Sequence, residues 1–213
     1  MAKKPDFKRR PQDQIYCFQI SLPGTDPLVW RKVMVPGLFT LEALNSVFQL
    51  VMGWQMKHLY DFQIGNERYS ETDDFLEVQP KSVAASIASA VGSKKSFFYT
   101  YDFGDDWRHE VIVEDILSRK SEMNYPICIG GENACPPEDC HGVHSYEDLK
   151  KIISDPKHEE YREMMEWLGG FFDPKSFDPN RINRDMLWMI DWDQGPDEQG
   201  LYRPFNFEFE AQA

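Results

Sequence analysis

One stretch of alternating aromatic residues constrains the fold more than any other part of the sequence. Every second position from residue 97 to residue 103 is aromatic: Phe97, Tyr99, Tyr101 and Phe103. A period of two places these side chains on one face of a β-strand. The segment Gly104-Asp105-Asp106 then supplies turn residues, and residues 109–117 alternate again. The sequence therefore predicts a β-hairpin with an aromatic face.

The same reasoning places further strands and one helix before this hairpin. Residues 15–22 and 28–35 are rich in β-forming residues and flank a turn cluster at 23–27, so we expect a second hairpin. Thr40 can cap a helix whose apolar residues recur at helical spacing as far as Gly53. Residues 58–64 and 67–69 are predicted to be strands.

The rest of the sequence is predicted to be mainly helical or irregular. We expect a short helix over residues 82–91 and an irregular segment over 118–144, which holds three of the four cysteines. An irregular segment of this length is typical of a functional or ligand-bound region. Further helices are predicted from Ser145, over 158–168, and from Asn180 through Ile190.

These elements predict a single α+β domain over residues 14–192. Its sheet is expected to be mixed or antiparallel, with helices packed on it and a helical C-terminal part. A basic, flexible arm (1–13) and an acidic, aromatic tail (193–213) flank the domain. Phe205, Phe207 and Phe209 alternate in the tail and could form an edge strand.

The charge balance argues against two classes of partner. Lys and Arg number 23 against 36 Asp and Glu, which gives a formal charge of −13. Tight binding of nucleic acid or anionic lipid depends on Lys and Arg, so we expect neither. Residues 1–10 carry a local charge of +4. This indicates a solvated chain end or, alternatively, a short arm that touches nucleic acid or an acidic partner.

The sequence holds no targeting or membrane-spanning segment. No apolar run approaches the roughly 18 residues of a membrane span, and no signal-peptide core follows the basic residues. We therefore expect a soluble, cytoplasmic protein without a membrane partner. Four cysteines in 213 residues are too few for a disulfide scaffold, so they are expected to be thiols or metal ligands.

The hairpin turn carries the most distinctive motif, Tyr101-Asp-Phe-Gly-Asp-Asp-Trp-Arg-His109. Its Asp-Phe-Gly does not indicate a kinase, because the glycine-rich loop and the His-Arg-Asp segment are missing. Aspartates are common in turns, but Trp107 and His109 are harder to explain in this way. A second acidic segment follows in the irregular region. The carboxylates of the two segments could bind a divalent cation or act as acid and base if the segments meet: Asp102, Asp105, Asp106, Glu138 and Asp139.

The irregular segment also offers five soft or borderline metal ligands: Cys128, Cys135, Cys140, His141 and His144. Zinc takes four such ligands in a tetrahedron, but the spacing here matches no common zinc motif. The more common interpretation is buried, inert thiols. Trp30, Arg31 and Trp54 could recognise a ligand, although tryptophans of this kind are more often part of the core or its rim.

Several of these motifs resemble those of one known family in their order and spacing. The resemblance rests on Leu28-Val-Trp-Arg-Lys32, Gly53-Trp54-x3-His58, the block from Phe98 to His109, and Pro136-Pro-Glu-Asp-Cys140. In order and spacing they are similar to the Ri-plasmid ORF-three-like family over about residues 14–190. The family positions carried over are Trp30, Arg31, Trp54, His58, Asp102, Gly104, Asp105, Trp107, His109, Pro137, Glu138, Asp139 and Cys140. His141 and His144 stand where the family usually has glycines, so a zinc site using them would be local to this chain.

The resemblance implies a prokaryotic α+β domain without established activity, partly associated with mobile elements. It favours a binding or accessory module for a protein or small molecule, with Trp30, Arg31, Trp54, His58, Trp107 and His109 as binding residues. The first alternative is a metal-assisted hydrolase or nuclease, with Asp102, Asp105, Glu138 and Asp139 as ligands and His109 as the general base. The second is a structural zinc module formed by the cysteine segment.

Overall fold

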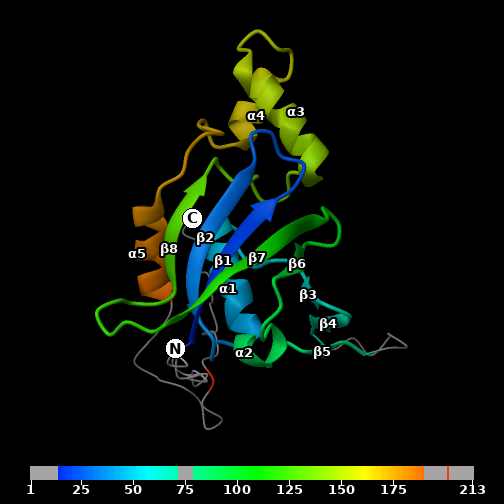
Figure 1. Ribbon diagram of the computed structural model, residues 1–213. Helices are drawn as coiled ribbons and strands as arrows, with labels where there is room; N and C mark the ends of the chain where they lie inside the picture. Colours follow the sequence, from blue (N-terminus) through cyan, green and yellow to red (C-terminus); the bar gives the residue numbers. More distant parts are fainter. Residues whose placement is uncertain (1–13, 72–78, 190–200, 202–213) are drawn as a thin grey trace, which may run out of the picture.

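The computed structural model of the protein describes residues 14–71, 79–189 and 201. Its centre is an eight-stranded sheet with the strand order β5-β4-β3-β6-β7-β1-β2-β8 (Figure 1). The strands are β1 (Gln14–Leu22), β2 (Val29–Pro36), β3 (Tyr60–Ile64), β4 (Glu67–Ser70), β5 (Lys81–Ser82), β6 (Ser96–Tyr101), β7 (Trp107–Ser118) and β8 (Ile127–Glu132). All neighbouring strands are antiparallel except the β4–β5 pair, which is parallel.

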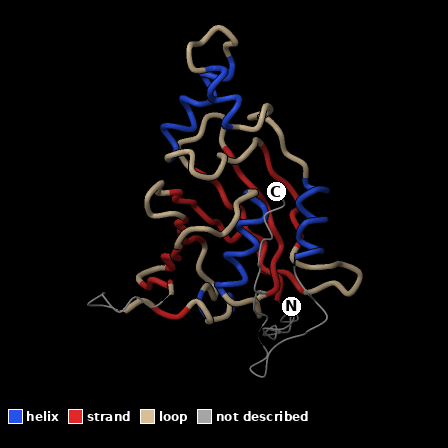
Figure 2. The backbone as a smooth tube through the Cα atoms, turned by 180° about the vertical axis from the view of Figure 1, so that it is seen from behind, coloured by secondary structure: helices blue, strands red, loops and turns tan. Residues whose placement is uncertain are grey.

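The helices are distributed unevenly around the sheet. They are α1 (Leu41–Met52), α2 (Ile87–Ala90), α3 (Gly142–Ser154), α4 (Tyr161–Trp167) and α5 (Pro179–Met189). Helix α1 covers one face of the sheet and α5 runs along β8, whereas α3 and α4 stand together at one end of the molecule (Figures 1 and 2). None of the described helices is long and apolar enough to cross a membrane.

Three of the four residues of the predicted aromatic face, Phe97, Tyr99 and Tyr101, lie in the core beneath α1, whereas Phe103 lies in the turn and is 46% exposed. In the β6–β7 register Tyr99 lies opposite His109, and Tyr101 lies opposite Trp107. The ring centroids of Phe48 on α1 and Tyr99 on β6 are 5.2 Å apart. The helix is fixed at both ends, because the Thr40 hydroxyl accepts a hydrogen bond from the Ala43 N–H and Gly53 takes a left-handed conformation. The alternating aromatic residues of β6 thus form part of the core, and the turn at residues 102–106 follows directly after them.

The predicted α+β class, the two hairpins and the helix after Thr40 are confirmed. The irregular segment 118–144 was predicted wrongly in part, because it contains the edge strand β8. The pair Gly130-Gly131 indicates a loop in the sequence, but Gly131 has a packing reason. A Cβ at this position would lie 2.7 Å from the Phe177 ring and 2.8 Å from the Arg31 side chain.

Other element boundaries also differ from the prediction. The region expected to form a helix over 82–91 is strand β5 followed by the four-residue helix α2. Helix α3 begins at Gly142 and not at Ser145, because the loop before it is tied to the hairpin turn at His141. Strand β3 begins at Tyr60, which leaves His58 in a loop. The basic arm and the proposed tail strand at Phe205, Phe207 and Phe209 lie outside the described residues.

Candidate functional site

Three loops from distant parts of the sequence meet at one end of the sheet. They are residues 53–59 after α1, the turn 102–106 between β6 and β7, and residues 133–141 between β8 and α3; we call them the three-loop cluster. The Trp54 indole N–H donates to the Pro136 carbonyl over 2.9 Å, and its ring stacks on Tyr101 at 5.1 Å. The Asp102 N–H donates to the Leu59 carbonyl over 2.9 Å. The two acidic segments therefore lie beside one another and beside a buried indole.

Tyr101 and Glu138 join the hairpin to the third loop. The Tyr101 hydroxyl donates to Glu138 Oε1 over 2.6 Å and accepts a hydrogen bond from the Lys57 N–H over 3.1 Å. Burial and the bond to Glu138 raise the pKa of Tyr101 well above its usual value, so the hydroxyl stays protonated and donates. The Gln55 N–H also donates to Glu138 Oε1, over 3.4 Å. Tyr101 and Glu138 thus bring all three loops together.

Asp105 holds the start of α3 against the hairpin turn. Its Oδ2 accepts a hydrogen bond from the His141 N–H over 2.9 Å. The next residue, Gly142, has φ of +85°, and a Cβ there would lie 2.8 Å from the Asp105 carbonyl oxygen. The backbones approach so closely that a side chain at 142 would force them apart. Asp105 therefore has a structural role, and its Oδ2 is not free to act as a ligand beside the other carboxylates.

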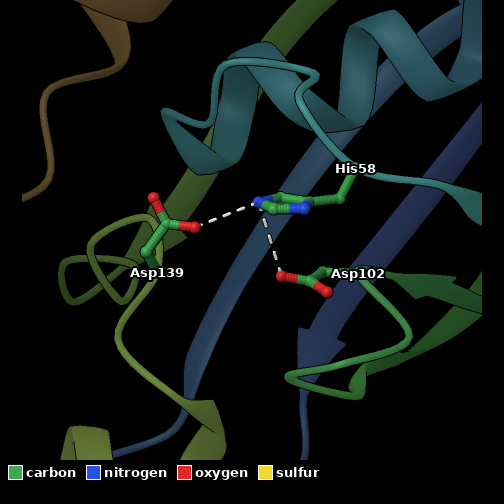
Figure 3. Close-up of side chains that lie close together, drawn as sticks. All are labelled: His58, Asp102 and Asp139. Carbon is green, nitrogen blue, oxygen red and sulfur yellow. Dashed lines mark hydrogen bonds and ion pairs between the residues drawn. The ribbon is translucent and has the colours of Figure 1, made fainter.

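At the centre of the cluster, one donor atom from each loop points to the same place (Figure 3). His58 Nε2 lies 3.1 Å from Asp139 Oδ1 and 3.6 Å from Asp102 Oδ2. The three donor atoms all lie within 4.8 Å of one another. The other carboxylate oxygen of Asp102 is used within its turn, where it accepts the Gly104 N–H over 2.9 Å and the Asp105 N–H over 3.4 Å. Those bonds orient Asp102 with its second oxygen toward His58.

The spacing of these donors is close to that of ligands on one metal ion. With metal–ligand bonds of about 2.1 Å, two ligand atoms on one ion lie roughly 3.0–3.4 Å apart; the His58–Asp139 distance of 3.1 Å lies in this range and the His58–Asp102 distance of 3.6 Å lies slightly above it. One imidazole and two carboxylates suit a borderline or hard divalent ion such as Zn²⁺ or Mn²⁺. The Asp102 side chain is 13% exposed and that of Asp139 is 57% exposed, so one side of the group is buried and the other faces solvent. An ion held here would keep open positions for a ligand.

The backbone of the three-loop cluster is strained at several points. Among the described residues, six other than glycine have a positive φ: Met56, Asp102, Asp106, Asn133, Asp139 and His141. All six lie on these three loops. Left-handed backbone costs free energy for residues with a Cβ, and such residues concentrate at functional sites. Asp102 and Asp139, both in the donor group, have φ of 54° and 58°.

His109 was predicted to be a binding residue or, in the hydrolase alternative, the general base, and its complete burial argues against both roles. Its side chain is fully buried under Trp54 and Tyr99, with ring centroids 5.4 Å and 5.3 Å away. Burial lowers the pKa of His109 to about 4, so it is neutral near pH 7. No substrate reaches an imidazole in this position. Trp107 is buried beside it, with its ring 5.8 Å from that of Trp54, and both residues form part of the core.

The five cysteine and histidine side chains of the irregular segment do not assemble. Within the described residues, His58, Asp102 and Asp139 form the only group of three or more possible metal donors. The Cys135 thiol accepts a hydrogen bond from the Arg31 guanidinium over 3.0 Å. The remaining members point elsewhere: Cys128 contacts the Gly130 carbonyl, Cys140 is buried, and His141 and His144 are exposed. Burial raises the pKa of Cys135 to about 11 and that of Cys140 to about 12, so both are thiols at neutral pH.

Arg31 and Trp30 hold the sheet edge and do not belong to the donor group, although Arg31 also bonds to Asn133 and Cys135 on the third loop. The Arg31 guanidinium is 3% exposed and donates to the carbonyls of Val51, Glu132 and Asn133 over 2.8–2.9 Å. It joins α1 to β8 from its position on β2. The Trp30 indole N–H donates to the Glu132 carboxylate over 3.4 Å. These contacts give both residues a structural role, which the sequence had allowed for Trp30 but not for Arg31.

Sequence reasoning named every member of the donor group but grouped them differently. Asp102 and Asp139 were expected to act with Asp105 and Glu138, and His58 was expected to bind a ligand directly. Glu138 and Asp105 are instead bonded to Tyr101 and His141. His58 and Asp139 are 81 positions apart, and no spacing rule connects them. They are placed together by contacts between the loops, among them those of Trp54, Tyr101 and Asp105.

Comparison with known proteins shows which family and which proteins this chain is similar to. Residues 14–181 match the family described as plasmid pRiA4b ORF-3-like protein. An uncharacterized protein, y4hQ, from Sinorhizobium fredii (strain NBRC 101917 / NGR234) is 34% identical over 154 residues, which cover 71% of this chain and 79% of that protein. The crystal structure of a protein of unknown function, MM3350, from Methanosarcina mazei Go1 is similar with a TM-score of 0.73 and 35% identity. The match covers 79% of this chain and 97% of the other.

Proposed function

The chain belongs to the plasmid pRiA4b ORF-3-like family, and from this premise we propose that it is a binding module built around a divalent cation. His58, Asp102 and Asp139 hold the cation, and its open positions take an oxygen ligand from a small molecule or a partner protein. The convergence of one donor atom from each of three separate loops carries the proposal. The association of the family with mobile elements belongs to the same proposal and rests on the plasmid in the family's name.

A cation explains how such an acidic cluster is stable. Asp102, Asp105, Glu138 and Asp139 lie on two adjoining loops, and neighbouring carboxylates repel one another. A divalent ion neutralises part of this charge and binds the donor atoms in fixed geometry. The strained backbone at Asp102 and Asp139 fits donors held in place before an ion arrives.

One observation favours a second candidate, a metal-assisted hydrolase. Glu138 Oε2 is buried and has no hydrogen-bond partner within the described part of the chain, and Glu138 precedes the donor Asp139. This oxygen is closed to bulk solvent, so it could act as a base only on a water molecule that the cation holds inside the cluster. Glu138 would then replace His109 as the general base.

Calorimetric titration with Mn²⁺ tests the binding site directly. Mn²⁺ is chosen because thiols do not select it, so the four cysteines do not compete. The wild-type chain is expected to bind one ion. The variants His58→Ala and Asp139→Asn should each weaken binding by about tenfold or more, as loss of a ligand does.

The matched control is Asp115→Asn, which removes an exposed carboxylate near the other end of β7. It should leave Mn²⁺ affinity within about twofold of the wild type. Equal affinities in all four proteins, or no binding by the wild type, would overturn the proposal. Hydrolysis of a chromogenic ester or phosphate by the Mn²⁺-loaded chain, lost in Glu138→Gln with Mn²⁺ affinity kept, would select the hydrolase over the binding module.

A further inference from the structure

A cavity of about 330 Å³ lies between α3 and α4, beside the three-loop cluster. Its apolar wall comes from Leu149 and Ile152 on α3 and from Met164 and Trp167 on α4. Trp167 is a large apolar side chain left 48% exposed. Cavities of this size, with an apolar wall and a few polar groups, are typical of sites for small molecules.

Asp139 belongs to both the cavity and the donor group. It lines the cavity, and its Oδ1 is the atom that lies 3.1 Å from His58 Nε2. Asp139 is thus the residue that the cavity shares with the donor group, whereas His58 and Asp102 do not line the cavity. A ligand with its apolar part between the helices would have its head group at the open coordination positions.

The charged side chains around the cavity bear on which charge the head group of a ligand can carry. Asp139 and Asp148 line it, and the side chain of Asp148 is paired with Lys151 over 2.7 Å. Lys150 is paired with Glu147 over 2.8 Å, so it does not stand as an isolated positive charge. Without a cation, the Asp139 carboxylate repels an anionic head group; with one, the same place attracts it. The start of α3 adds no free positive field, because the Asp105 carboxylate accepts a hydrogen bond from the His141 N–H there.

We propose that this cavity binds a medium-chain carboxylate, with its alkyl chain between α3 and α4 and its carboxylate on the cation held by His58, Asp102 and Asp139. The inference rests on the proposed cation site and names the ligand class for it. It requires binding of the carboxylate and of the cation to be coupled, because each favours the other.

The test uses octanoate as the probe and the full chain as the protein. Octanoate affinity is measured by calorimetry with saturating Mn²⁺ and again with EDTA, and n-octanol serves as the neutral probe with the same chain length. Octanoate should bind about tenfold or more tightly with Mn²⁺, whereas the affinity for n-octanol should be the same in both conditions. The variant Ser145→Phe fills the cavity from α3, and Ser154→Phe, at the exposed end of the same helix, is its matched control.

Ser145→Phe is expected to keep Mn²⁺ affinity within about twofold and to lose octanoate affinity by about tenfold, while Ser154→Phe keeps both. Two results overturn the inference while leaving the cation site standing. One is octanoate binding that does not depend on Mn²⁺; the other is octanoate binding that is unchanged in Ser145→Phe. If the wild type binds no Mn²⁺, the proposed function fails first and the inference fails with it. Circular dichroism of each variant separates loss of the cavity from loss of the fold.

Discussion

A single buried imidazole gives this fold a defined response to acid. His109 is neutral in the folded protein because burial lowers its pKa from 6.5 to about 4. Its Nδ1 lies 3.2 Å from the Tyr99 carbonyl, and its Nε2 has no partner among the described residues. Below pH 6.5 the unfolded chain takes up a proton that the folded chain does not. The contribution of neutral His109 to the unfolding free energy is therefore complete above pH 6.5 and falls as the pH drops toward 4.

We expect the wild type to lose about 2 kcal/mol of unfolding free energy through His109 between pH 7 and pH 4.5. The variant His109→Leu lacks the titrating group, so its unfolding free energy should fall by about 2 kcal/mol less between the same pH values. Urea unfolding of both proteins at both pH values measures the difference. Any loss of packing in the variant applies at both pH values and cancels. Equal pH-dependent losses in the two proteins would show that other groups cause the acid response.

At the scale of elements, the alternation of apolar and polar residues predicted those strands in which every second side chain is buried. It succeeded for β6 and β7 because Phe97, Tyr99 and Tyr101 face α1 while the intervening residues face outward. It failed for β8, where Gly131 is required by the Phe177 ring and not by a turn. The donor group could not be predicted as a set, because His58, Asp102 and Asp139 are joined only through contacts between loops. The sequence did predict that the two acidic segments would be important if they met.

Strand β8 supplies a matched pair of glycines that tests this explanation. Gly131→Ala would place a Cβ 2.7 Å from the Phe177 ring and 2.8 Å from Arg31, whose guanidinium is fixed by its bonds to three carbonyls. Overpacking against such rigid neighbours is expected to cost about 1–3 kcal/mol of unfolding free energy. Gly130→Ala meets only ordinary contacts, with the nearest Trp30 atoms at 3.7 Å. It should change stability by about 0.5 kcal/mol or less. Denaturant unfolding compares them, and equal costs would contradict a packing role specific to Gly131.

At the scale of the whole molecule, the three-loop cluster ties together the helix α1, the β6–β7 hairpin and the connection to α3. Trp54, Tyr101 and Asp105 each make one of these links through hydrogen bonds to another loop. The links bring together the donors on the loops that follow α1, β6 and β8. A cation bound there would act on all three loops at once. Its effect is therefore expected in the stability of the entire domain as well as in the local geometry.

Mn²⁺ should accordingly raise the melting temperature of the protein. An ion that binds only the folded chain adds about 2.7 kcal/mol of stability at a free concentration of 100 times its dissociation constant. For a domain of this size, each kcal/mol shifts the melting temperature by about 2–4 °C, so a rise of roughly 5–10 °C is expected. Asp139→Asn removes an exposed ligand that makes few other contacts, so its melting temperature should be nearly that of the metal-free wild type and should respond little to Mn²⁺. Differential scanning calorimetry of both proteins, with and without Mn²⁺, measures the shifts. An equal rise in wild type and variant would place the ion elsewhere, because stabilisation through His58, Asp102 and Asp139 needs all three donors at one point.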